Sequence, residues 1–99
     1  MQYNRAAAKQ WTRNTLSGYI VTTTTPFKHD FEIDYAGLRH NVDHLIGLPG
    51  ARGLYLGSVY QEFWTLTMDE RKRVTDTMIE ANAGRVPIIA GVSHTSYKD

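Results

Sequence analysis

The sequence predicts an α/β fold in which parallel strands alternate with helices. Three stretches with strand composition, at 19–27, 53–57 and 86–92, are separated by two stretches with helical periodicity, at 34–46 and 67–83. Such alternation is typical of right-handed β-α-β units. The third strand, VPIIAGV, is apolar without the every-second-residue alternation of a half-exposed strand. This pattern indicates burial on both faces, as in a parallel sheet.

The first 17 residues are predicted to form a basic extension, and residues 18–99 the α/β domain. Residues 4–15 have the composition of one short helix, and no acidic residue occurs before Asp30. A basic, acid-free N-terminus also occurs in organelle-targeting peptides. Solvated charges on a surface helix explain the composition more simply, and we favour that interpretation.

The first strand and the first helix of the domain have clear boundaries in the sequence. YIVTTTTPF at 19–27 is β-branched almost throughout and ends at Pro26, as strands often do. The helix is predicted to begin after Asp34, whose carboxylate can accept hydrogen bonds from the free N–H groups of the first turn. An apolar stripe at helical spacing follows, formed by Leu38, Val42, Leu45 and Ile46. Gly47 is expected to end the helix.

The second strand, GLYLG at 53–57, leads into a helix that is predicted to begin at Thr67. TMDE at 67–70 is a capping box, in which the threonine and Glu70 satisfy each other's backbone N–H groups. The predicted inner stripe of this helix consists of Val74, Met78, Ala81 and Ile79. Gly84 is predicted to end it as a left-handed C-cap. After the third strand, SHTSYKD at 93–99 is predicted to cap and begin another helix.

Composition and charge exclude several functional classes. The chain has 99 residues, 41% of them hydrophobic and 21% charged, which is enough for one small globular domain. Its net charge of +1 offers no field for nucleic acid or for a membrane surface, and no apolar run is long enough to span a bilayer. Without cysteine the chain can form neither disulfides nor thiolate zinc sites, which fits a cytoplasmic location.

Several short motifs occur in an order that resembles one enzyme family. TPF at 25–27 follows the first strand, Gly57-Ser58 ends the second, and GRVPIIAGV at 84–92 contains the third. Between the last two lie Glu62, Leu66-Thr67 and Glu70-Arg71. From about Gly18 to its end, the sequence is similar to the N-terminal part of the dihydrodipicolinate synthase / N-acetylneuraminate lyase family. The resemblance implies a (β/α)₈ TIM barrel, of which residues 18–99 would form about the first three parallel strands with two to three helices.

The resemblance also implies a chemistry. Family members are Schiff-base (class I) aldolase-type lyases or synthases that act on pyruvate or a related 2-keto acid, often as homotetramers, and no metal or organic cofactor is implied. A lysine on a later strand forms an imine with the keto carbon, and the imine withdraws electrons from the neighbouring carbon–carbon bond. No predicted strand contains any of the four lysines, which are Lys9, Lys28, Lys72 and Lys98. We therefore expect the imine lysine to lie outside these residues, and this chain alone to be inactive.

The site residues that the resemblance implies follow the first and second strands. Ser58 lies where the family places a hydroxyl that relays protons, and the backbone amides of the same loop, at Ser58 and Val59, would hold the carboxylate of the keto acid. Thr22, or alternatively Thr24, would point into the barrel near the floor of the site. Two simpler explanations stay open, because a serine can merely cap a loop and because β propensity alone explains a row of threonines.

The loop after the second strand also departs from the family pattern. The family has glycine, one or two hydroxyl or small residues and then Gly-Glu, whereas this loop reads GSVYQE at 57–62, with one extra residue. Glycine permits a backbone to approach a ligand closely, so its replacement argues for a divergent aldolase or hydratase-lyase. Tyr60, Phe63 and Trp64 are predicted to pack against a neighbouring loop or subunit, and a pocket for a larger substrate is the alternative.

The histidines and the missing lysine leave a second functional class open. His40 and His44 are four residues apart on the predicted first helix, a spacing that suits a metal, but no third ligand accompanies them and we expect a surface pair. His94 follows the third strand, toward the mouth of the barrel, with no predicted role. A non-catalytic small α/β module or a decayed gene product is the alternative to the enzyme.

Overall fold

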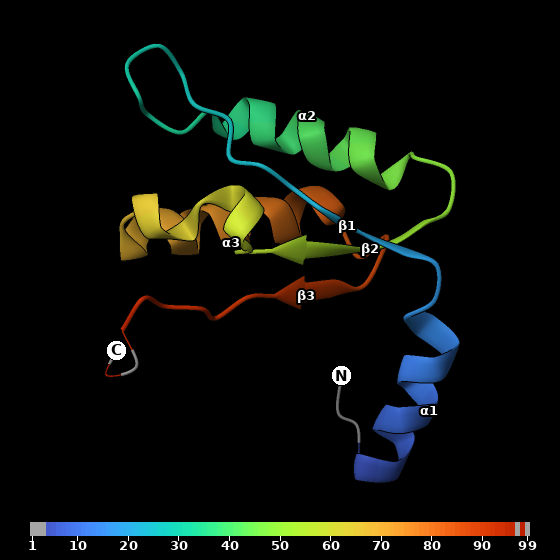
Figure 1. Cartoon of the computed structure of the whole chain (residues 1–99). Coiled ribbons are helices and arrows are strands. Elements are labelled where there is room, and N and C mark those ends of the chain that lie inside the picture. Colours follow the sequence, from blue (N-terminus) through green and yellow to red (C-terminus); the bar gives the residue numbers. More distant parts are fainter. Residues whose placement is uncertain (1–3, 97, 99) are drawn as a thin grey trace.

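The computed structural model describes residues 4–96 and 98, and it contains one parallel sheet with helices beside it (Figure 1). Its elements in chain order are α1 (Arg5–Thr15), β1 (Tyr19–Thr22), α2 (Tyr35–Ile46), β2 (Ala51–Leu56), the short 3₁₀ helices η1 (Val59–Gln61) and η2 (Phe63–Thr65), α3 (Met68–Asn82) and β3 (Ile88–Ala90). The strand order is β1-β2-β3, and both neighbouring pairs are parallel. The predicted alternation of parallel strands and helices is confirmed.

The core lies between the sheet and the two long helices α2 and α3. From β2, Leu54 and Leu56 point toward the helices, and they are 0% and 1% exposed. The helices contribute the rest of the buried cluster, which includes Leu38, Val42, Val74 and Met78. Fully burying one such side chain stabilises the fold by about 1.5–3 kcal/mol, so this layer is the main reason that the helices stay on the sheet.

In the described part of the chain, the opposite face of the sheet carries no helix. Thr22, Tyr55 and Ile89 are aligned across the three strands, and successive strand residues alternate between faces, so these three lie on the side away from Leu54 and Leu56. Ile20 covers Gly53 on the same side, because a Cβ atom at Gly53 would lie 2.7 Å from its Cδ1. We call this side, with Ile20, Thr22, Tyr55 and Ile89, the open face.

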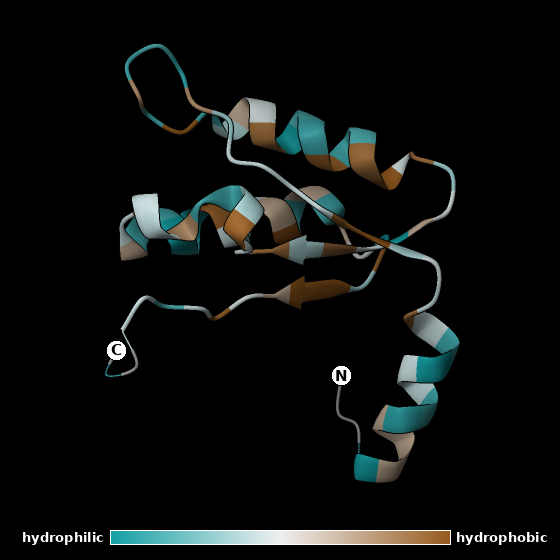
Figure 2. Ribbon diagram, in the orientation of Figure 1, coloured by the Kyte–Doolittle hydropathy of each residue, from teal (hydrophilic) through white to brown (hydrophobic). Residues whose placement is uncertain are grey.

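The sheet also has two free edges. Among the described residues, β1 and β3 each pair only with β2. Figure 2 shows that β3 is strongly hydrophobic, whereas α1 is mostly hydrophilic and extends away from the sheet. No residue of α1 is buried, in agreement with the surface helix that the composition predicts.

Both predicted helix starts are confirmed. The Asp34 carboxylate accepts a hydrogen bond from the Gly37 N–H at 2.9 Å. Thr67 and Glu70 form the complete capping box, with hydrogen bonds of 2.9 and 3.1 Å. At the other end, α3 finishes one residue earlier than predicted, because Ala83 already has a positive φ of 50° and Gly84 follows with 72°.

The strands differ from the predicted boundaries. The first is predicted over 19–27, but β1 ends at Thr22, because its pairing with β2 stops there. The Thr23 hydroxyl then approaches Met78 Sδ at 3.7 Å, and the Thr25 hydroxyl donates to the Gln61 carbonyl at 2.8 Å. The third strand shortens in the same way, to Ile88–Ala90.

Two predictions for the C-terminal part are wrong or lie partly outside the described residues. Ile79 is 49% exposed instead of facing the core. Asn82 of the same helix is buried instead, and its side chain makes hydrogen bonds of 2.8 and 3.1 Å with the backbone of Val86. The helix predicted to begin in 93–99 does not appear in 93–96, while residues 97 and 99 lie outside the described part.

Candidate functional site

The C-terminal ends of all three parallel strands lie at one edge of the sheet, where barrel enzymes place their active sites. The loop from Gly57 to Glu62 leaves β2 at this edge. Its Gly57 has a positive φ of 67°, and Glu62, between the two 3₁₀ helices, has φ 53° and ψ 50°. These two residues with positive φ turn the loop back over the C-terminal end of β2.

Ser58 is buried at the start of this loop, with 3% of its surface exposed. Its Oγ accepts a hydrogen bond from the Tyr60 N–H at 3.2 Å, which makes it the N-cap of η1. This is the capping contact that the sequence left open as the simpler explanation. A hydroxyl also carries one proton to donate and a second lone pair, so the cap leaves Ser58 able to interact with a ligand.

The backbone N–H groups of the loop divide into two sets. One set donates within the loop, at distances of 2.6–3.2 Å, and consists of Gly57, Tyr60, Gln61 and Glu62. The N–H groups of Ser58 and Val59 donate to no acceptor in the described part of the chain. Successive N–H groups that are free in this way can bind an anion such as a carboxylate. We call Ser58 and Val59 the amide pair.

Gln61 is a site residue that the sequence reasoning missed. It is 1% exposed, although its neighbours Tyr60 and Glu62 are exposed. Its Oε1 accepts the Gly57 N–H at 2.6 Å, and its Nε2 approaches Met78 Sδ at 3.4 Å. The available signal was a polar residue in the position of the family's glycine, one residue before Glu62.

Thr22 lies on the open face beside Tyr55, and its role at the floor of a site stays a prediction. It is half-buried and also borders a pocket of about 240 Å³ against α2, at the free edge of β1. Thr23 points to the opposite side, into the core, and is 1% exposed. Among the hydrogen bonds of the described residues, none joins Thr22 to Ser58.

The three aromatic residues Tyr60, Phe63 and Trp64 differ in how far they are exposed. Phe63 is 9% exposed, and the Arg71 guanidinium carbon lies 5.0 Å from its ring centroid. This ring therefore packs within its own chain, and the expected contact of these aromatic residues with a neighbouring loop or subunit stays a prediction. Tyr60 and Trp64 are 65% and 53% exposed, so they remain available for such a contact.

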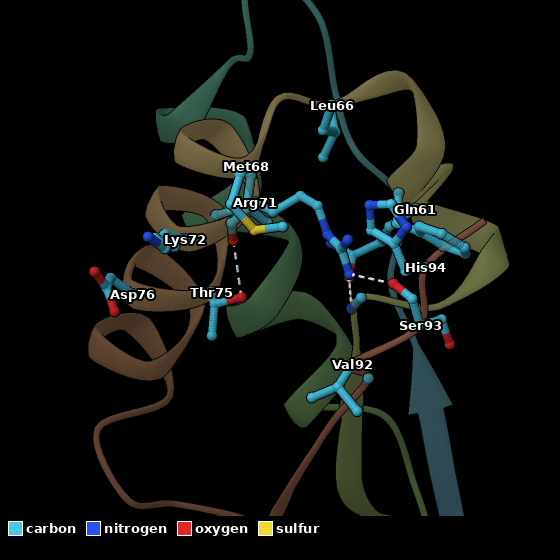
Figure 3. A pocket seen from close by; sticks show the side chains of 14 residues that line it. Gln61, Leu66, Met68, Arg71, Lys72, Thr75, Asp76, Val92, Ser93 and His94 are labelled. Carbon is cyan, nitrogen blue, oxygen red and sulfur yellow. Dashed lines mark hydrogen bonds between the residues drawn. The ribbon is translucent and has the colours of Figure 1, made fainter. Parts of the chain in front are cut away.

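A pocket of about 490 Å³ lies between α3 and the ends of β2 and β3 (Figure 3). Arg71 crosses it and donates to the Ser93 carbonyl at 2.8 Å, while His94 Nδ1 accepts the Ser96 N–H at 3.0 Å. Neither member of the amide pair is among the described residues that line this pocket. Because residues of α3 line the pocket, it lies on the helix side of the sheet, and the open face is on the other side.

No cluster of three or more His, Cys, Asp or Glu side chains suited to a metal occurs in the described residues. His40 and His44 are both exposed on α2, as expected for a surface pair. The strands contain no lysine, since Lys9 and Lys72 lie in helices and Lys28 and Lys98 in loops. In the described part of the chain, no helix has the length and hydropathy needed to cross a membrane.

Comparison with known proteins decides the family. The model of the Dihydrodipicolinate synthetase family matches residues 15–99. The chain belongs to this family. Its relatives include the 4-hydroxy-tetrahydrodipicolinate synthase of Methanothermobacter thermautotrophicus, which is 34% identical over 84 residues that make up 85% of this chain and 29% of the relative. A probable 5-dehydro-4-deoxyglucarate dehydratase of Bradyrhizobium diazoefficiens is 37% identical over 78 residues, which cover 79% of this chain and 24% of that protein.

Solved structures of the dihydrodipicolinate synthetase family share the fold. An N-acetylneuraminate lyase from Mycoplasma synoviae superposes with a TM-score of 0.79 and 29% identity, over 86% of this chain and 29% of the lyase. A dihydrodipicolinate synthase from Bacillus anthracis gives a TM-score of 0.70 and 32% identity, over 77% and 26%. The three strands are thus the N-terminal part of a TIM barrel, and the chain spans less than a third of the length of these relatives. Since barrel helices lie outside, the open face corresponds to the barrel interior.

Proposed function

We propose that this member of the dihydrodipicolinate synthetase family is a Schiff-base aldolase-type lyase or synthase for pyruvate or a related 2-keto acid, and that the backbone N–H groups of Ser58 and Val59 bind the acid's carboxylate. The observation that carries the proposal is the amide pair: two successive N–H groups that have no acceptor among the described residues, at the C-terminal end of β2. A carboxylate has two oxygens, and each can accept one of these hydrogen bonds.

In this mechanism the chain holds and orients the substrate, and a lysine elsewhere in the full-length protein reacts with it. The lysine amine attacks the keto carbon, and loss of water gives a protonated imine. The bond that breaks lies one carbon further from the imine carbon: a base takes the proton of the hydroxyl group beyond it, an aldehyde leaves, and the electrons of the bond form an enamine with the imine, while condensation follows the reverse path. Ser58 Oγ, beside the amide pair, relays a proton between the substrate and a later tyrosine, and Thr22 lies at the floor of the site.

The altered loop supports a substrate that differs from that of a standard synthase. Val59 offers only its backbone N–H where the family commonly has a second hydroxyl, and Tyr60 and Gln61 replace the glycine. The relatives named dehydratases and lyases are compatible with such a divergent activity. We also propose that the full-length protein is a homotetramer, with the exposed Tyr60 and Trp64 at a subunit contact, which analytical ultracentrifugation would test.

Borohydride trapping tests the proposal. The full-length protein is incubated with isotopically labelled pyruvate and sodium borohydride, and the modified peptide is identified by mass spectrometry. We expect one reduced adduct, on a lysine outside residues 1–99, and no adduct on a 99-residue chain. If the full-length protein gives no adduct with pyruvate or with a panel of other 2-keto acids, the Schiff-base proposal is wrong.

A non-catalytic binding module is the second candidate, because none of the four lysines of this chain lies in a strand. The same experiment separates the two. Keto-acid binding in calorimetry without any trapped adduct in the full-length protein would favour the binding module.

A further inference from the structure

The buried residue Gln61 joins three segments at the strand ends, two through its carboxamide and one through its backbone carbonyl. Its Oε1 accepts the Gly57 N–H at the end of β2, at 2.6 Å. Its Nε2 contacts Met78 Sδ on α3 at 3.4 Å, and its backbone carbonyl accepts the Thr25 hydroxyl, from the segment after β1, at 2.8 Å. A buried polar side chain is costly unless its donors and acceptors are paired, and here both ends of the carboxamide have partners.

This arrangement fixes where the amide pair begins. Gly57 is bonded to Gln61 on one side and faces Gly91, the residue after β3, on the other, since a Cβ atom at Gly57 would lie 2.9 Å from the Gly91 carbonyl oxygen. The Gly57 N–H is therefore occupied, and the next two N–H groups, those of Ser58 and Val59, are the first free donors of the loop. Gln61 thus acts on the amide pair through Gly57 and touches neither of its N–H groups.

Glu62 does not have this role. It is exposed, its φ is 53°, and among the described residues its side chain makes no hydrogen bond. An ionised glutamate has only acceptors, whereas the position of Gln61 needs an acceptor for Gly57 and a donor toward Met78. The position of Gln61 therefore suits an amide and not an ionised carboxylate.

We infer that Gln61 is the positioning residue of the carboxylate-binding loop, and that the adjacent Glu62 is dispensable for it. The expected effect of Gln61 on catalysis rests on the proposed function. The effect of Gln61 on the loop itself can be measured without any substrate.

The test uses the full-length protein with three substitutions. Gln61→Met keeps the length and apolar volume of the side chain and removes the acceptor for Gly57. Glu62→Met is the matched control at the adjacent exposed position. Thr25→Val removes only the hydroxyl that binds the Gln61 carbonyl and keeps the side-chain shape, so it remains informative if Gln61→Met fails to fold.

The first readout is hydrogen–deuterium exchange of the segment 56–60. We expect Gln61→Met to accelerate exchange about tenfold, as for the loss of one buried hydrogen bond, Thr25→Val to accelerate it less, and Glu62→Met to leave it within about twofold of the wild type. The inference is overturned if Glu62→Met accelerates exchange as much as Gln61→Met, or if both Gln61→Met and Thr25→Val leave it unchanged.

The second readout separates positioning from general destabilisation. With the keto acid that gives the trapped adduct, we expect Gln61→Met to raise KM about tenfold while kcat falls less than about threefold, because binding of the carboxylate is weakened and the lysine is untouched. An equal loss in kcat with unchanged KM would contradict the inference. If the wild type neither binds nor traps a keto acid, the proposed function fails, and the exchange experiment alone decides the role of Gln61.

Discussion

Replacing Gly57 by alanine should destabilise the protein more than the same change at Gly84, although both glycines have a positive φ. The values are 67° and 72°, in the left-handed region where a Cβ atom costs about 1–2 kcal/mol. At Gly84 no atom lies within 4 Å of the added Cβ, whereas at Gly57 the Gly91 carbonyl oxygen is 2.9 Å away and the Cα 3.6 Å away. Relieving that overlap requires the ends of β2 and β3 to separate, which adds about 1–3 kcal/mol.

We therefore expect a loss of about 1–2 kcal/mol for Gly84→Ala and about 2–5 kcal/mol for Gly57→Ala. The assay is chemical denaturation of the two variants and the wild type, followed by circular dichroism under identical conditions. Gly84→Ala is the control for the backbone conformation, and the difference between the variants isolates the contact with Gly91. Equal losses, or a larger loss for Gly84→Ala, would refute the reasoning that β3 limits the space at Gly57.

Three further changes test the core, a helix cap and a surface ion pair. Leu54→Ala should lower the free energy of unfolding by about 2–5 kcal/mol in denaturant titrations, because the side chain is completely buried between the sheet and both helices; a loss below 1 kcal/mol would contradict this core. Thr67→Ala should cost about 1 kcal/mol and increase hydrogen exchange in the first turn of α3, because it removes one half of the capping box. Arg39→Ala should cost less than about 1 kcal/mol, and its effect should vanish in 1 M salt, since the 2.7 Å pair with Glu80 joins side chains that are 48% and 65% exposed.

The helices were predictable from the sequence because their determinants are local. The Asp34 cap and the Thr67 capping box act within three residues, so no knowledge of the tertiary structure is needed to find them. Strand ends are set by partners far away in the sequence. β1 stops at Thr22 because the Thr23 and Thr25 side chains turn to Met78 and Gln61, which are 55 and 36 residues further along the chain.

The residues of the candidate site also divide into those that the local sequence identifies and those that depend on distant contacts. The resemblance to the family was enough to select Ser58 and Val59, since both lie at a fixed place after the second strand, and whether they bind substrate remains a prediction. Gln61 could not be found in this way, because its importance arises from contacts with Gly57 and Met78 and from a burial that no local pattern announces. Nor does the sequence separate Phe63 from Trp64, although the first packs under Arg71 and the second stays exposed.

The free edges of β1 and β3 and the open face bear on how the protein is made. In the M. thermautotrophicus relative, the matching region makes up 29% of the protein, and in an N-terminal position it leaves the ribosome before the remaining strands have been translated. At that stage the nascent sheet presents unpaired backbone groups on both sides and an apolar surface that includes Ile20 and Ile89. Such surfaces attract one another when several copies are translated from one messenger RNA. Ribosome-associated chaperones should therefore engage this segment while its open face and its two edges are uncovered.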